Sequence, residues 1–161
     1  VFLVNGMNVM SVVYCLMTSA LLVLSVIDWR TFEIPFGINV FLGILGIVAV
    51  VLDKGEWLNH VIGAVCVSGF LLLLYLLSKG RAIGGGDIKL MAACGLLLGW
   101  QKSILAFLLG CIVGSVIHLF RMKISKEGHV LAMGPYLAAG IFLAALFGGQ
   151  WIHWYLDALG I

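Results

Sequence analysis

Charged residues are scarce in this chain of 161 residues, where only 10% of the positions are Asp, Glu, Lys or Arg. A soluble globular domain carries about 25% charged residues. Hydrophobic residues make up 63% of the sequence, and the mean hydropathy is +1.21. This composition excludes an ordinary soluble domain and predicts an integral membrane protein. The net charge of +2 is too small to indicate nucleic-acid binding.

Paired cysteines are absent as well. The four cysteines, Cys15, Cys66, Cys94 and Cys111, lie singly within apolar runs, and no C-x-x-C pair occurs. Because zinc sites and redox pairs rely on closely spaced cysteines or histidines, the sequence predicts no metal and no cofactor. The first apolar run has no basic segment before it and no A-x-A-like site after it, so no cleavable signal peptide is expected.

Long apolar runs take up most of the chain. A membrane-spanning helix needs roughly 20 apolar residues, and the runs are too long and too continuous for the alternating strands of a membrane barrel. The sequence therefore predicts an all-α, polytopic membrane protein with about six transmembrane helices. The expected spans are Val9–Ile27, Phe36–Leu52, Trp57–Leu77, Ile88–Trp100, Ile104–Phe120 and Val130–Phe147.

Lysine and arginine are unevenly distributed between the connections on the two sides of these spans. Six follow odd-numbered spans and two follow even-numbered spans. The six are Arg30, Lys79, Arg81, Arg121, Lys123 and Lys126, and the two are Lys54 and Lys102. Since positively charged loops stay on the cytosolic side, we expect both termini outside and connections one, three and five in the cytosol.

Three glycines, Gly84, Gly85 and Gly86, precede Asp87 at the start of the fourth span. At ~1.5 Å per residue this span, Ile88–Trp100, covers about 20 Å, which is less than the ~30 Å hydrocarbon core. The glycine-rich segment is therefore expected below the cytosolic surface. Irregular backbone at that depth requires protein or a water-filled cavity around it. We expect Asp87 to line a water-filled cavity that is open to the cytosol.

Asp28 ends the first span on the same expected side as Asp87, which follows 59 positions later in the sequence. Two neighbouring carboxylates share a proton because both cannot ionise easily. The ionised member can take a proton from water while the protonated member hydrogen-bonds the developing oxyanion. The pair therefore indicates an aspartic protease. Helix capping by either aspartate is the alternative reading.

Three stretches carry a family resemblance. They are Asp28 followed seven residues later by Pro35, then Gly84-x-Gly86-Asp87-x-Lys89-Leu90, and finally Gly134-Pro135-Tyr136-Leu137-Ala138-Ala139-Gly140. Together they resemble the type IV prepilin leader peptidases, which are intramembrane aspartic proteases of the GxGD class. The resemblance runs from about residue 20 to residue 147.

The resemblance implies a single transmembrane peptidase domain over residues 1–161. Asp28 and Asp87 match the two catalytic aspartates of the family. Gly84 and Gly86 match the glycines of the active-site loop, which let the second aspartate approach the first.

Four further residues are candidates for a supporting role: Pro35, Lys89, Gly134 and Pro135. Pro35 is expected to open the second span, where its missing N–H is harmless. Lys89 lies two residues beyond Asp87, so on a helix it points ~200° away from that carboxylate. This favours a contact with lipid headgroups or a loop over a catalytic role.

The resemblance implies removal of a short basic leader from type IV prepilins or pseudopilin-like proteins at the cytosolic face of the bacterial inner membrane. The substrate and the bilayer are the expected partners, and the oligomeric state is not indicated. Larger members have an N-terminal insert with paired C-x-x-C motifs and also methylate the new N-terminus. Because this chain has no such pair, we expect cleavage without methylation.

Two functions of other classes compete with the protease. One is a small transporter or channel that uses Asp28 and Asp87 as a proton or cation relay. The other is a non-catalytic membrane scaffold in which both aspartates cap helices. A relay needs ionisable groups across the membrane, whereas the two carboxylates are expected to cluster at one face. This clustering favours hydrolysis.

Small residues indicate close helix packing in two places. Gly95 and Gly99 have the G-x-x-x-G spacing in the fourth span, and Gly110 and Gly114 have it in the fifth. This spacing suits tight contacts between membrane helices. We expect contacts within the chain, with the hairpin between the two spans at Gln101–Ser103.

The remaining polar features are given structural roles. His60 and His118 are expected to be hydrogen-bonded structural residues, and Glu33 a solvated loop charge. The tail Gln150–Ile161 holds two tryptophans and a tyrosine, which suits an anchor at the membrane interface.

Overall fold

The computed structural model describes residues 1, 6, 8–80, 83–124 and 133–160, with the side chains of 121–124 and 159 left aside. The described residues form helices and short connections and contain no strand. The helices are α2 (Val9–Thr31), α3 (Phe36–Leu52), the short 3₁₀ turn η1 (Lys54–Glu56), α4 (Trp57–Leu77), α5 (Gly85–Leu98), α6 (Trp100–Ile124) and α7 (Gly134–Leu159). The predicted all-α class is confirmed.

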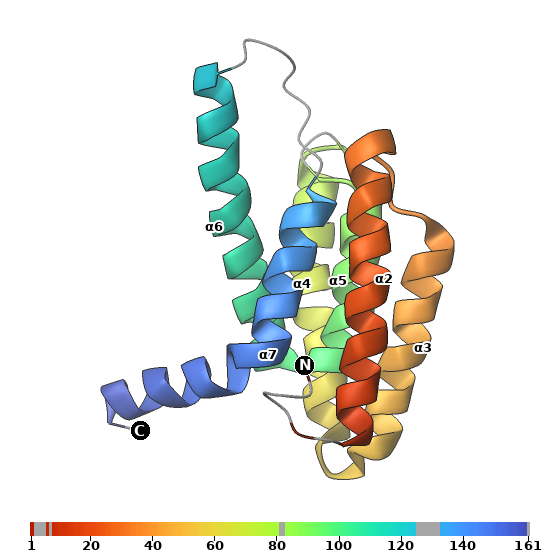
Figure 1. Ribbon diagram of the computed structural model, residues 1–161, viewed down its shortest axis with the longest axis vertical. Coiled ribbons are helices and arrows are strands. Elements are labelled where there is room, and N and C mark those ends of the chain that lie inside the picture. Colours follow the sequence, from red (N-terminus) through yellow and green to blue (C-terminus); the bar gives the residue numbers. More distant parts are fainter. Residues whose placement is uncertain (2–5, 7, 81–82, 125–132, 161) are drawn as a thin grey trace.

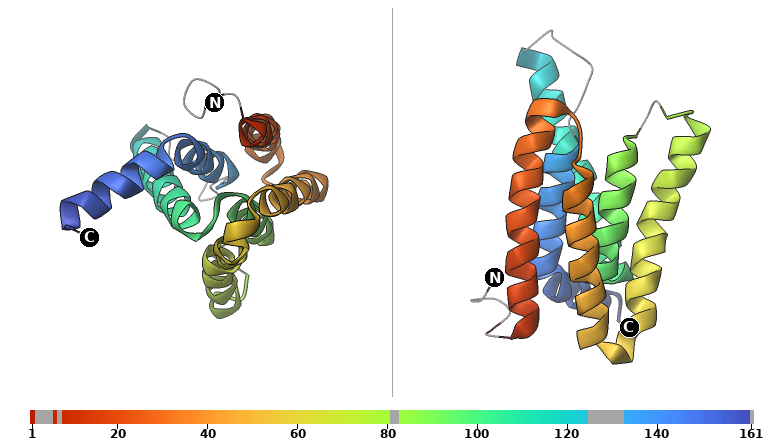
Figure 2. Two further views of the ribbon diagram at one scale, coloured as in Figure 1. Left: turned by 90° about the horizontal axis from the view of Figure 1, so that it is seen from below. Right: turned by 90° about the vertical axis from the view of Figure 1, so that its right-hand side faces the viewer.

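The helices run alternately up and down in one bundle (Figures 1 and 2). α2 packs against α3 and α7, α5 packs against α3 and α4, and α6 packs against α4 and α7. α2 therefore ends at the same end of the bundle at which α3, α5 and α7 begin. We call this the aspartate end, because Asp28 lies in the last turns of α2 and Asp87 in the first turn of α5.

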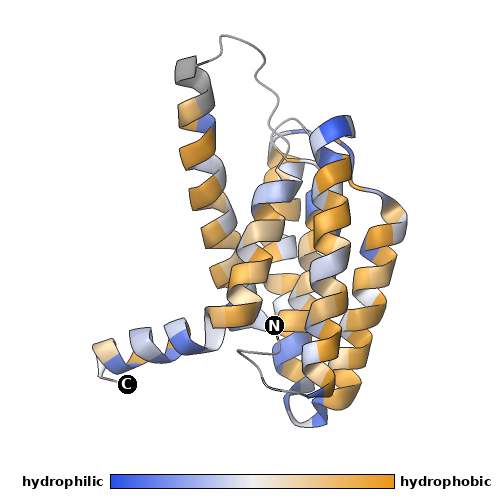
Figure 3. Cartoon of the chain, viewed as in Figure 1, coloured by the Kyte–Doolittle hydropathy of each residue, from blue (hydrophilic) through white to orange (hydrophobic). Residues whose placement is uncertain are grey.

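Four stretches are long and apolar enough to cross a membrane: Val9–Thr31, Lys54–Leu77, Trp100–Phe120 and Gly134–Ala158. α3 is apolar but shorter, with 17 residues. Most residues of these helices are apolar (Figure 3). Many of the large apolar side chains are exposed, as expected where the solvent is lipid. The chain is therefore a multi-pass membrane protein.

α5 is the shortest of the main helices and has 14 residues, which corresponds to about 21 Å. It is also a buried helix, since Leu90, Met91, Cys94 and Leu97 are fully enclosed. Neighbouring helices cover α5, so it does not need the length of a lipid-exposed span. The six expected spans thus correspond to six helices, but they are unequal in length.

Gly99 marks the sharp turn between α5 and α6. Its φ of 80° lies in the left-handed region that favours glycine. The next residue, Trp100, already begins α6 and donates its N–H to Asn59 Oδ1 at 3.0 Å. The predicted hairpin at Gln101–Ser103 is therefore wrong. These polar residues form the first turn of the helix, and one glycine makes the reversal.

The expected close packing within the chain is confirmed by the glycines. A methyl group on Gly95 would collide with the Gly63 carbonyl of α4. On the other side of the bundle, a Cβ on Gly110 would lie 3.1 Å from Leu137 of α7. Gly140 of α7 is equally confined by the Ala106 carbonyl of α6. Close backbone contacts of this kind join α4 to α5 and α6 to α7.

The C-terminal part of α7 turns away from the bundle and runs sideways at the end opposite the aspartates (Figure 1). The expected tail, Gln150–Ile161, is helical through Leu159. Trp154 and Tyr155 are exposed there. This arrangement agrees with an interfacial anchor, since Trp and Tyr side chains favour the membrane–water boundary.

Candidate active site

Asp28 is a buried carboxylate in the last turn of α2, with 4% of its surface exposed. Its Oδ2 accepts a hydrogen bond of 3.0 Å from the backbone N–H of Gly134. Gly134 is the first residue of α7, and the N–H groups at the start of a helix have no partner within the helix. The N-terminus of α7 therefore supplies a donor and a favourable dipole to the Asp28 carboxylate.

Gly134 leaves room for that carboxylate. A Cβ at this position would lie 2.6 Å from Asp28 Oδ2 and 2.9 Å from its Cγ. Pro135 follows in the first turn of α7, where a residue without an N–H is well tolerated. The Gly-Pro pair thus starts α7 directly against Asp28. Sequence reasoning proposed both residues for support but did not identify this contact.

Asp87 lies in the first turn of α5 and is 7% exposed. Its N–H donates to the Gly84 carbonyl at 3.1 Å. Gly84 is the N-cap residue, and a Cβ there would lie 3.2 Å from Asp87 Oδ2. A carboxylate in the first turn of a helix is stabilised by the helix dipole.

Gly86 allows α5 to approach the connection between α2 and α3. A Cβ on Gly86 would lie 2.9 Å from Cβ of Ile34. Gly84 and Gly86 were both predicted to lie in a loop, but Gly86 is inside the first helical turn. The helix begins at Gly85, three residues before the expected span. The close approach of backbones that the glycines predicted is nevertheless present.

Asp28 and Asp87 line one cavity of about 310 Å³ at the aspartate end. The other lining residues are Phe32, Glu33, Ile34, Gly84, Gly85 and Gly86. The structure therefore brings together two acidic side chains that stand 59 positions apart in the sequence. Such a pair can hold one proton between its members and polarise water.

The connection between α2 and α3 forms one wall of the cavity. Phe32 ends α2 in a left-handed conformation with φ of 54° and donates its N–H to the Asp28 carbonyl at 2.9 Å. Glu33 is exposed and lines the cavity. Pro35 does not line the cavity and is the N-cap of α3, so it sets the start of that helix. Sequence reasoning missed Phe32 and Ile34 because neither carries a polar group.

Asn39 is a second residue that sequence reasoning missed. It is buried in α3 at 6% exposure, and its Nδ2 donates to the Gly86 carbonyl at 3.5 Å. Its Oδ1 has no hydrogen-bond partner among the described residues. A lone amide in an otherwise apolar helix was the available signal, because buried polar groups normally have a bonding role.

Lys89 points away from the cavity, as the helical angle predicted. It is exposed, and its Nζ lies 5.4 Å from the ring centroid of Phe36 at the start of α3. This geometry is that of a cation–π contact. Lys89 therefore joins α5 to α3 next to the cavity and does not line it.

The comparison with protein families gives a match over residues 15–119 to the family described as "Type IV leader peptidase family". This match includes Asp28, Asp87 and the glycines of the cavity, but not Gly134.

Curated relatives match as well. A prepilin leader peptidase/N-methyltransferase of Aeromonas salmonicida is 37% identical over 109 residues, covering 63% of this chain and 37% of the relative. Relatives with the same description in Stutzerimonas stutzeri and Bacillus subtilis are 32% and 30% identical. Each covers 88% of this chain, and the chain covers 52% and 58% of their lengths. The chain thus spans between 37% and 58% of the length of these three relatives. No solved structure matches.

Proposed function

Because this chain belongs to the type IV leader peptidase family, we propose that it is an intramembrane aspartic endopeptidase, with residues 1–161 as its peptidase domain. Its substrates are type IV prepilins or pseudopilin-like proteins, from which it removes the leader. The observation that carries the proposal is the shared cavity of Asp28 and Asp87.

In this proposal the two carboxylates share one proton. The ionised carboxylate takes a proton from a water molecule, and the oxygen of that water attacks the scissile carbonyl carbon. The protonated carboxyl donates a hydrogen bond to the carbonyl oxygen as negative charge develops there. The tetrahedral intermediate then breaks its C–N bond when the leaving nitrogen receives a proton from the pair. Gly134 N–H holds the Asp28 carboxylate in place throughout.

Basic residues support a cytosolic position for the cavity. Arg30 in the last turn of α2 and Lys79 after α4 lie at the aspartate end, whereas Lys54 and Lys102 lie at the opposite end. Arg81 and Lys126 lie outside the described residues, as do the side chains of Arg121 and Lys123. By the positive-inside rule, this distribution favours an aspartate end that faces the cytosol of a bacterial inner membrane.

A groove between α2 and α7 is suited to the apolar helix that follows the cleaved bond. It has a volume of about 320 Å³ and is lined by Thr18, Leu21, Leu22, Ser25, Pro135, Ala138, Ala139 and Phe142. It starts at Pro135, next to the Gly134–Asp28 hydrogen bond. Small residues in its wall permit close approach of another helix within lipid. A substrate helix in this groove would place the preceding peptide at Asp28.

The proposal is tested with the purified chain in lipid and a full-length prepilin that carries its basic leader. Mass spectrometry of the products is expected to show one cut, at the end of the leader. A matched prepilin in which the basic leader residues are replaced by glutamine is expected to be cleaved more slowly. Absence of any peptide product, together with proton or cation flux in vesicles, would favour the relay instead.

A further inference from the structure

A second polar cavity lies at the end of the bundle opposite the aspartates. Its volume is about 350 Å³. Residues from α2, α4, α5, α6 and the sideways part of α7 surround it, and the polar ones are Tyr14, Asp53, Glu56, Asn59, His60, Gln101, Lys102 and His153. None of these residues takes part in the proposed cleavage, and the cavity shares no lining residue with the site of Asp28 and Asp87.

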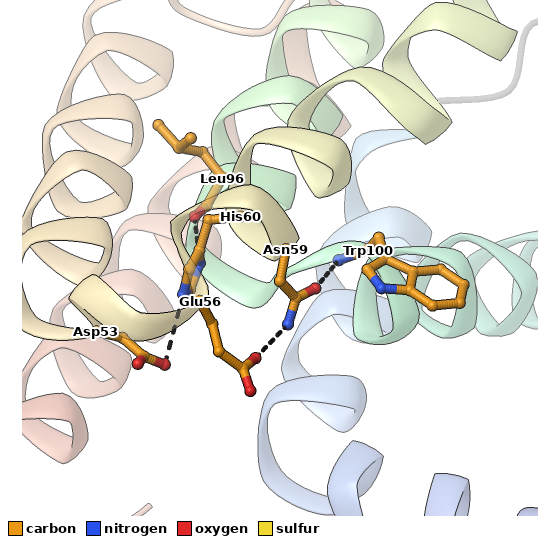
Figure 4. A network of polar contacts seen from close by, with 6 residues as sticks. All are labelled: Asp53, Glu56, Asn59, His60, Leu96 and Trp100. Carbon is orange, nitrogen blue, oxygen red and sulfur yellow. Dashed lines mark hydrogen bonds and ion pairs between the residues drawn. The ribbon is translucent and has the colours of Figure 1, made fainter.

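The acidic wall of this cavity is held in place by hydrogen bonds (Figure 4). Asn59 Nδ2 donates to Glu56 Oε2 at 2.8 Å, and Asn59 Oδ1 accepts the N–H of Trp100 at 3.0 Å. One residue further on, His60 is buried, with its Nδ1 2.8 Å from the Leu96 carbonyl and its Nε2 3.8 Å from Asp53 Oδ2. This confirms the hydrogen-bonded structural role expected for His60.

The basic wall is formed by Lys102 in the first turn of α6. The stem of Lys102 packs against α7, where a Cβ on Gly148 would lie 3.2 Å from Lys102 Cγ. No ion pair to Lys102 occurs among the described residues. The ammonium group is therefore available to an anion within the cavity. His153 of α7 lines the cavity on the same side of the bundle.

An apolar cavity of about 580 Å³ adjoins the polar one. Leu105, Trp151, Trp154 and Tyr155 line it together with Ile152 and Leu156, and these last two residues also line the polar cavity. Ile152 and Leu156 are four residues apart on one face of α7. One face of this helix therefore borders both a charged compartment and an apolar compartment. An amphiphilic ligand has a polar part and an apolar part that match these two compartments.

The expected height of the two cavities in the membrane agrees with an amphiphilic ligand. The site lies where α4 and α6 begin and where the tail of α7, rich in aromatic residues, runs sideways (Figures 1 and 2). Aromatic residues of this kind gather at the height of the lipid headgroups. A phospholipid in the adjoining leaflet reaches both compartments without leaving the bilayer.

We propose that the two cavities form a binding site for one phospholipid whose headgroup carries both a phosphate and a primary ammonium, that is, a phosphoethanolamine lipid. The phosphate pairs with Lys102, the ammonium donates to Glu56 and Asp53, and an acyl chain lies against Trp151 and Leu105. A purely anionic headgroup would meet the two carboxylates without a cation of its own. A choline headgroup has no N–H to donate to them.

The test uses the purified chain, stripped of lipid in detergent. Phosphatidylethanolamine, phosphatidylglycerol and phosphatidylcholine with identical acyl chains are added separately, and the bound lipid is counted by native mass spectrometry. We expect phosphatidylethanolamine to bind about tenfold more tightly than the other two, because it alone satisfies charge-assisted hydrogen bonds on both walls. Equal or tighter binding of phosphatidylglycerol or phosphatidylcholine would overturn the proposal.

Variants locate the site. Glu56→Gln is expected to abolish this preference, so that phosphatidylethanolamine binds no better than phosphatidylcholine. Lys102→Gln is expected to weaken the binding of all three lipids, because each of them carries a phosphate. The matched controls Lys54→Gln and Asp157→Asn change exposed residues at the same end that do not line the polar cavity, and they are expected to keep the preference. An undiminished preference in Glu56→Gln, or undiminished binding of all three lipids in Lys102→Gln, would place the lipid elsewhere. If a variant does not fold, the comparison of the three lipids on the unaltered chain still tests the proposal.

Discussion

The backbone N–H of Gly134 donates to Oδ2 of Asp28 across 106 positions of sequence, at 3.0 Å. This bond ties the start of α7 to the end of α2 and fixes one of the two carboxylates in the cavity. The other carboxylate, Asp87, is fixed from α5, so the site depends on three helices that meet at one end of the bundle.

Gly134→Ala is expected to reduce prepilin cleavage by about a hundredfold, because a small displacement of a reacting group has an effect of that order. The new Cβ would lie 2.6 Å from Asp28 Oδ2, so the carboxylate must move. Initial rates of leader release measure the effect. Gly43→Ala is the control, since a Cβ there meets no atom within 4 Å. An unchanged rate in Gly134→Ala would separate this contact from catalysis.

Asn39→Ala is expected to lower kcat about tenfold and to leave KM within about twofold, because Asn39 positions the first turn of α5 through the Gly86 carbonyl. Asn39 is a positioning residue, since it does not line the cavity. Ile44→Ala, at an exposed position of the same helix, is the control for general loss of side-chain volume. A rise in KM with constant kcat would instead assign Asn39 to substrate binding.

Lys89→Gln is expected to keep at least about half of the wild-type cleavage rate. Its ammonium contacts the exposed ring of Phe36 and not the cavity. The loss of an exposed cation–π contact removes only ~0.5–1 kcal/mol of stability, which is measured by thermal unfolding. Phe36→Leu is the matched change on the other side of the contact. A large loss of cleavage in Lys89→Gln alone would give Lys89 a role in catalysis.

Ala139→Leu is expected to raise KM for a full-length prepilin several-fold, because the larger side chain fills the groove between α2 and α7. A short peptide that lacks the apolar helix should be cleaved at the wild-type rate. Ala158→Leu makes the same substitution at an exposed position of α7 outside the groove. Equal KM values for the full-length substrate in wild type and Ala139→Leu would place the substrate helix elsewhere.

The common position of Asp28 and Asp87 could be predicted because the apolar runs give the number of spans, and the two spans between these residues return the chain to the same end. α3 and α4 have the expected bounds because Pro35 and the polar residues after Leu52 interrupt the apolar pattern. The turn at Gly99 could not be predicted, since polar residues of a first helical turn resemble a loop in sequence.

Two hydrogen bonds that complete the site, from Asn39 to Gly86 and from Gly134 to Asp28, could not be predicted from the sequence either. Asn39 lies in a helix that is apolar on every side, so periodicity could not show that it faces α5. The bond between Gly134 and Asp28 joins residues from opposite ends of the chain. Its geometry depends on the packing of α2 against α7, and local sequence patterns do not predict how distant helices pack.

Initial rates of prepilin cleavage by Asp28→Asn, Asp87→Asn and the double variant test the central claim most directly. Asparagine keeps the shape of each buried side chain but cannot share a proton, so each single variant should lose nearly all activity and the double variant should lose no more. Thermal unfolding confirms that the variants are folded. A folded single variant that cleaves at the wild-type rate, or losses that multiply in the double variant, would contradict a catalytic pair.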